Sequence, residues 1–201
     1  MKLEEFLKNY LTSKNDLEHA THTKDTSLEI YSNLKKIFPN NHILDFENAE
    51  KLISYSALLH DIGTNLSISL LKPHNKIGAK LILENKIDDL TIEQTKIVAL
   101  SVRYHRGSKP KEKHRLFGSL NQKDKNAVKV VSSILRLADS LDCNHLQSAQ
   151  NIVLMYDFNK AVLTLNPQVN IIFNKGIKRV FDKKKTLFEE VFKTKIYLEN
   201  D

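Results

Sequence analysis

The segment Ala57-Leu58-Leu59-His60-Asp61-Ile62-Gly63 places an adjacent histidine and aspartate directly after an apolar stretch. Apolar side chains recur at helical spacing from Glu47 onward, so we predict a helix over Glu47–His60, with Gly63 as a stop just past its end. An ionisable pair at this position is costly to bury unless both groups are satisfied. A divalent cation satisfies both, because imidazole nitrogen and carboxylate oxygen are each metal ligands. The segment therefore predicts part of a metal site.

Two adjacent side chains cannot complete a coordination sphere, so further ligands must come from elsewhere in the chain. His19 lies early in the first long predicted helix, and Asp139 lies within an apolar predicted helix. Taken alone, His19 is typical of a surface or hydrogen-bonded core histidine, and Asp139 of a partner for Arg136. The ordered set His19, His60-Asp61, Asp139 on successive helices is a more specific pattern, and it predicts convergence on one cation.

His22 leaves the identity of the first ligand open. It follows His19 by three residues, so both side chains lie on the same face of the predicted helix. His19 is the favoured ligand, and His22 stays an alternative.

The periodicity of apolar residues predicts a helical body followed by a small mixed unit. Thr91-Ile92-Glu93-Gln94 is a capping-box pattern that opens one of these helices. The predicted helices of the body span residues 17–38, 47–60, 74–86, 91–104 and 127–141. The later part is predicted to contain a hairpin of strands at 152–158 and 161–165, a helix at 177–192 and a possible strand at 195–198. We therefore divide the chain into a helical domain, 1–150, and an α/β subdomain, 151–201.

The composition is that of a globular protein of 201 residues, with 41% hydrophobic and 27% charged residues. No apolar run approaches the ~20 residues that span a bilayer, and the first residues lack a secretion signal. A lone cysteine, Cys143, fits a reducing compartment. We therefore expect a cytoplasmic protein with no membrane partner. The net charge of +7 suits a polyanionic ligand, although scattered lysines equally suit a solubilising surface.

The ordered set resembles the pattern of the HD phosphohydrolase superfamily. More closely, the chain resembles the C-terminal HD region of the exopolyphosphatase/guanosine pentaphosphate phosphatase family. The matching stretches are Glu18-His19-Ala20, Ala57-Leu58-Leu59-His60-Asp61-Ile62-Gly63, Val102-Arg103-Tyr104-His105-Arg106, Ile134-Leu135-Arg136-Leu137-Ala138-Asp139-Ser140-Leu141-Asp142 and Leu187-Phe188-Glu189-Glu190-Val191-Phe192. The resemblance implies a mainly α fold, an HD-domain helical bundle with a small C-terminal α/β appendage.

The resemblance also implies a divalent metal cofactor, namely manganese, magnesium, iron, cobalt or zinc. Its implied ligands are His19, His60, Asp61 and Asp139. The implied activity is that of a metal-dependent phosphohydrolase acting on a nucleotide, another phosphate ester or polyphosphate. In this hypothesis the cation activates water and polarises a phosphoryl oxygen.

Residue roles follow from the same hypothesis. Asp61 and His105 are the candidate catalytic residues. The candidate phosphate-binding residues are Arg103, Arg106, Lys109 and Arg136, because guanidinium groups match phosphate oxygens. Arg103 and Arg106 have an ordinary alternative, since positive side chains stabilise the C-terminal end of a helix.

The chain departs from the family pattern in two respects. His74 is retained in the stretch His74-Asn75-Lys76-Ile77-Gly78, but Ile77 replaces a usual histidine, which puts a second metal centre in doubt. His22 and His74 remain possible additional metal or phosphate contacts. No Gly-rich phosphate loop or actin-like domain accompanies the helical region, so exopolyphosphatase activity is not carried over.

A non-catalytic function is the alternative. The HD fold would then bind polyphosphate, nucleotide or RNA, or dock onto a separate actin-like phosphatase subunit. A homo-oligomer is a further possible assembly. Metal analysis and a phosphate-release screen distinguish the two hypotheses.

Overall fold

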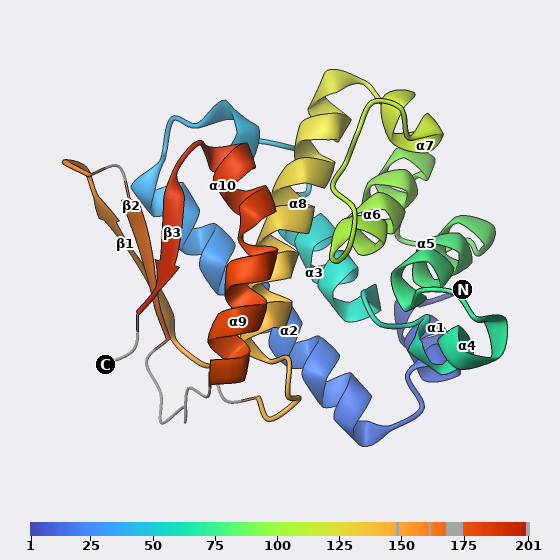
Figure 1. The fold of residues 1–201 in the computed structure, drawn as a ribbon. Helices are drawn as coiled ribbons and strands as arrows, with labels where there is room; N and C mark the ends of the chain where they lie inside the picture. Colours follow the sequence, from blue (N-terminus) through green and yellow to red (C-terminus); the bar gives the residue numbers. More distant parts are fainter. Residues whose placement is uncertain (148, 161, 168–174, 200–201) are drawn as a thin grey trace.

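The computed structural model describes residues 1–147, 149–160, 162–167 and 175–199. Most of these residues are helical, and three strands form a small sheet at one side of the molecule (Figure 1). The helices are α1 (Leu3–Tyr10), α2 (Lys14–Ile37), η1 (His42–Leu44), α3 (Ala49–Leu59), α4 (Thr64–Leu70), α5 (His74–Glu84), α6 (Ile92–Tyr104), α7 (Arg115–Gly118), α8 (Gln122–Leu141), α9 (Lys175–Lys184) and α10 (Thr186–Phe192). The predicted fold class, mainly α with a small α/β appendage, is confirmed.

Local capping explains where the long helices begin. The Ser13 side chain accepts a hydrogen bond from the Asp16 amide at the start of α2, and Asn121 does the same for Asp124 in α8. The capping box predicted at Thr91 is present at the start of α6, with Gln94 as its second member. These caps satisfy amide groups that would otherwise lack partners.

Some elements differ from the predictions. The last helix of the body begins at Gln122, five residues before the predicted start at Ala127, because the cap lies at Asn121. The helix predicted over 177–192 is two helices, α9 and α10. The short helices α1, α4 and α7 were not predicted, since each is too short for a clear apolar period.

The sheet has the order β1-β2-β3, with β1 (Ile152–Asp157) antiparallel to β2 (Val162–Pro167) and β2 parallel to β3 (Lys195–Leu198). The hairpin and the final strand are thus confirmed, and the predicted first residue of the second strand, Ala161, lies outside the described residues. The chain reaches β3 from β2 through α9 and α10, which lie against α8 (Figure 1).

The C-terminal appendage (β1, β2, α9, α10 and β3) and the helical body (α1 to α8) share an apolar core. Ile30 of α2, Leu137 of α8, Leu163 of β2 and Phe181 of α9 belong to one buried cluster. A second buried cluster joins α1, α3, α5 and α6. Because α9 packs on α8, Lys184 at the end of α9 lies beside Asp139 of α8.

No helix among the described residues has the length and apolar character that crossing a membrane requires.

Candidate metal centre

Three buried ligand-type side chains from α2, α8 and the end of α3 meet in the helical body. His19 Nε2 lies 3.2 Å from His60 Nε2, and 3.9 Å from Asp139 Oδ1. We call His19, His60 and Asp139 the first donor group, because one ligand atom from each lies within 4.8 Å of the others. The structure thus brings together residues that lie 120 positions apart in the sequence.

A second set of ligand atoms lies beside the first. His74 Nε2, at the start of α5, lies 3.2 Å from His105 Nε2, which caps the end of α6. Asp61 Oδ1 lies 3.1 Å from His74 Nε2 and 3.8 Å from His105 Nε2. We call Asp61, His74 and His105 the second donor group. It forms without a side chain from position 77, where the buried Ile77 stands.

Asp61 connects the two groups, because its carboxylate oxygens face in different directions. Oδ2 lies 3.4 Å from His60 Nε2 and 4.0 Å from His19 Nε2, whereas Oδ1 faces His74 and His105. A carboxylate placed in this way can ligate one cation through each oxygen. Asp61 is therefore the candidate bridge of a two-ion centre.

The outer ring nitrogens fix the direction of three imidazoles. His60 Nδ1 donates to the Ala57 carbonyl oxygen at 2.7 Å, and His105 Nδ1 donates to the Val102 carbonyl oxygen at 2.8 Å. His19 Nδ1 donates to Asp142 Oδ2 at 2.7 Å. In neutral rings with a proton on Nδ1, each Nε2 presents a lone pair toward the centre.

These lone pairs provide a test of whether a metal fits. His19 Nε2 and His60 Nε2, both acceptors in this arrangement, face each other at 3.2 Å and cannot hydrogen-bond to one another. A cation between them satisfies both, and an oxygen that accepts from each outer nitrogen is the usual arrangement around metal-bound histidine. The donor set, nitrogen and carboxylate oxygen without sulfur, fits a divalent first-row metal or magnesium.

The protonation states of His105, Asp139 and Asp61 also suit metal ligands. Burial lowers the pKa of His105 to about 3, with the neighbouring His60 acting in the same direction, so the ring is neutral at physiological pH. Burial acts to raise the pKa of Asp139, but the Lys184 ammonium and the nearby imidazoles outweigh it and hold the pKa well below its usual range. For Asp61 too, burial is outweighed by His60 and His74, and the pKa is lowered. Both carboxylates are thus ionised.

Gly63 has a different role from the predicted helix stop. Its φ is −86°, an ordinary value for any residue. A Cβ at this position would lie 2.2 Å from the His74 carbonyl oxygen and 2.7 Å from the Gly78 amide nitrogen. The absent side chain therefore lets the turn after α3 approach the start of α5 closely, which brings His74 to Asp61.

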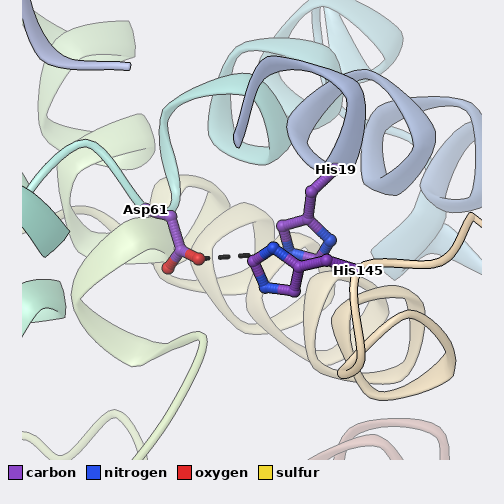
Figure 2. Close-up of side chains that lie close together, drawn as sticks. All are labelled: His19, Asp61 and His145. Atoms are coloured by element: carbon purple, nitrogen blue, oxygen red, sulfur yellow. Dashed lines mark ion pairs between the residues drawn. The ribbon is translucent and has the colours of Figure 1, made fainter. Parts of the chain in front are cut away.

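His145 and Asp142 were missed as site residues. The His145 ring stacks on the His19 ring, with centroids 3.8 Å apart, and Asp61 faces the two rings (Figure 2). Asp142 holds both histidines in place: Oδ2 binds His19, Oδ1 accepts from the Gln147 amide at 2.7 Å, and its carbonyl accepts from the His145 amide at 2.9 Å. Asp142 lies one helical turn after Asp139, and that spacing was the available signal.

A cavity of about 550 Å³ opens beside the second donor group. Its basic lining residues are Arg106, Arg136, Lys183 and Lys184. Of the predicted phosphate-binding residues, Arg106 and Arg136 therefore line the cavity, whereas Arg103 and Lys109 do not. Lys109 pairs with Glu190 of α10. The two lysines of α9 were missed, because no local pattern indicates that the appendage reaches the site.

Arg136 has most of its hydrogen-bonding capacity engaged by the backbone. Its Nε donates to the Tyr104 carbonyl at 2.7 Å, and one terminal nitrogen donates to the carbonyls of Gly107 and Ser108, each at 3.0 Å. Arg136 therefore holds the loop after α6 in place, and this loop begins with Arg106, which lines the cavity.

His22, the alternative ligand, points elsewhere. Among the described residues it belongs to none of the donor groups, and its buried Nε2 has no hydrogen-bond partner there. The structure thus brings His19, and not His22, to the cluster.

The helical fold and the His, His-Asp, Asp cluster are those of an HD-type domain. The family model described as Ppx/GppA phosphatase, domain III, matches residues 8–195, and the chain belongs to this family. The match confirms the predicted resemblance and indicates a phosphatase-related role.

Proposed function

We propose that this protein is a phosphohydrolase with two divalent cations, held by the first and second donor groups and bridged by Asp61. The observation that supports it most strongly is the pairing of two inward Nε2 atoms, those of His19 and His60, because each ring donates its Nδ1 proton to an oxygen. No arrangement of protons on neutral imidazoles satisfies these atoms as well as a cation does. Metal-dependent hydrolysis was predicted from the sequence, and the second ion extends that prediction.

The cations would supply two things when bound: polarisation of a phosphoryl oxygen and a nucleophilic water near neutral pH. The chain's own residues would hold the cations and orient the ligand side chains. The carbonyl anchors on His60 and His105 keep both rings turned inward, and Asp142 does so for His19. Because His105 is neutral and buried, we assign it to the second cation, as a ligand and not as a proton donor.

Arg106 is the candidate contact for the substrate phosphate. It is exposed, it lines the cavity, and its guanidinium lies 3.4 Å from His74 Nδ1. A phosphoryl group bound at the second donor group would therefore meet a planar cation. A phosphate ester or inorganic phosphate chain is the class of substrate that this arrangement suits.

The test combines metal content with turnover. Purified protein is loaded with manganese, dialysed and analysed for metal per chain, then assayed for phosphate release with nucleotides, sugar phosphates and inorganic polyphosphate. We expect two ions per chain and manganese-dependent release from at least one substrate. In Asp61→Asn, we expect phosphate release to fall by more than about 100-fold. Mutation of residues that only support metal ligands lowers metal affinity or activity by about 10- to 100-fold, and loss of a ligand should cost more.

Asp25→Asn is the matched control, because Asp25 is exposed on the same helix as His19 and belongs to no donor group among the described residues. It should behave as the unmodified protein. Metal binding without phosphate release from any substrate would favour the non-catalytic alternative. Full turnover in Asp61→Asn would contradict the proposed centre.

A further inference from the structure

The appendage contributes a cation to the metal centre. Lys184, the last residue of α9, donates from Nζ to Asp139 Oδ2 of the first donor group. The pair is largely shielded from solvent, with side-chain exposures of 20% for Lys184 and 12% for Asp139. Lys183 and Val180 of the same helix line the cavity beside it. A side chain outside the helical body thus holds one of the ligands.

The two oxygens of Asp139 have different partners. Oδ1 faces His19 Nε2 at 3.9 Å, whereas Oδ2 carries the Lys184 ammonium. A divalent cation in the first donor group would share this carboxylate with the ammonium. Two positive charges a few ångströms apart in a shielded site repel each other, so metal and lysine compete for Asp139.

Once it leaves Asp139, the Lys184 ammonium can contact a phosphate bound in the adjacent cavity. Its ammonium is a point charge on a flexible four-carbon stem, and Lys184 lines the cavity that Arg106 also lines. A phosphate bound in that cavity carries negative charge that the ammonium can neutralise. No other ion pair of Lys184 is present among the described residues, so leaving Asp139 breaks no second salt bridge.

We propose that Lys184 is a movable counter-ion, which neutralises Asp139 in the metal-free protein and transfers to the substrate phosphate when the metal binds. Lys184 then opposes metal binding in the free protein and favours phosphate binding in the loaded one. Metal and phosphate become thermodynamically coupled through this side chain, and the coupling is reciprocal. The proposal rests on the proposed function, in that it needs a metal in the first donor group.

The test is titration calorimetry on Lys184→Met, with Lys178→Met as the matched control, because Lys178 is exposed on the same helix and does not line the cavity. Manganese is titrated into metal-free protein, and inorganic phosphate into manganese-loaded protein. In Lys184→Met we expect manganese to bind about fivefold more tightly, as the competing ammonium is gone. We expect phosphate to bind about tenfold more weakly. The control should change neither value.

Lys184→Gln covers the case in which the methionine variant does not fold without metal. Its amide can still donate to Asp139 but carries no charge, and we expect both affinities to shift in the same directions. Unchanged or weaker manganese binding in these variants would contradict the claim that Lys184 competes with the metal for Asp139. Unchanged phosphate binding would contradict the claim that Lys184 moves to the phosphate. If the unmodified protein binds no manganese, the proposed function itself fails; if it binds manganese and the variants match the control, only the lysine proposal fails.

Discussion

The two donor groups differ in how firmly the protein holds them. His19 and His60 of the first group have side-chain exposures of 1% and 0%, whereas His74 and Asp61 of the second have 15% and 21%. All three residues of the second group, His74, His105 and Asp61, line the cavity, whereas Asp139 is the only member of the first group that does so. The first group is thus buried throughout, whereas the second combines the buried His105 with two partly exposed ligands.

The hydrogen bonds that anchor the imidazole rings are also more complete in the first group than in the second. The two imidazoles of the first group are each anchored through Nδ1, His19 by a carboxylate and His60 by a backbone carbonyl. In the second group His105 is anchored in this way, but His74 Nδ1 lies beside the Arg106 guanidinium. A rigid, desolvated ligand set binds more tightly than one that must be ordered on binding. We therefore expect a tight ion in the first group and an exchangeable ion, close to the substrate, in the second.

The largest expected effect follows from removing a first-group ligand. In His60→Ala the tight ion loses a buried, anchored nitrogen, and manganese affinity should fall by more than about 100-fold, with loss of phosphate release. Calorimetry and metal analysis measure this. The exposed His42, outside the donor groups among the described residues, gives the control His42→Ala. Retention of the tight ion in His60→Ala would remove the distinction between the groups.

A second-group ligand should have a smaller and more selective effect. In His74→Ala we expect manganese content to fall from two ions to one, the weak ion to bind about 10- to 100-fold less tightly, and the tight ion to be unaffected. Turnover should be recovered in part at high manganese concentration. Equal loss of both ions would show that the groups form one inseparable unit.

The sequence predicted the ligands better than it predicted their grouping. His19, His60, Asp61 and Asp139 stand in a spaced pattern on helices whose apolar periods are clear, and the structure brings them together. The second group was doubted because of Ile77. Its formation depends on tertiary contacts, above all the close approach at Gly63 that brings His74 to Asp61, and no periodicity reports such a contact.

The same reasoning explains the misses in the appendage. The strands and helices of 152–198 could be read from alternation and periodicity, apart from the break between α9 and α10. That Lys184 reaches Asp139 depends on how α9 packs on α8, through buried residues such as Phe181 and Leu137. Long-range packing of this kind is not encoded in local spacing.

The smallest expected effect concerns the anchor of His19. Burial alone lowers the pKa of His19, but the hydrogen bond to Asp142 and the nearby carboxylates outweigh it and raise the pKa above its ordinary value. A proton on Nε2 competes with the metal, so manganese affinity should decline as the pH falls through this raised pKa. In Asp142→Asn the pKa drops, which moves the decline to lower pH, while affinity at high pH weakens about tenfold.

Manganese titrations across the range of pH 5 to 8 measure both changes, with Asp25→Asn as the control. An Asp142→Asn profile that declines at the same pH as that of the unmodified protein would show that Asp142 does not set the protonation of His19.

The central claim, two cations sharing Asp61, is tested most directly by anomalous X-ray scattering from crystals of the manganese-loaded protein. We predict two peaks about 3.5–4 Å apart, one on each side of the Asp61 carboxylate, the first among His19, His60 and Asp139 and the second beside His74 and His105. A single peak at full manganese loading, or peaks away from Asp61, would contradict it.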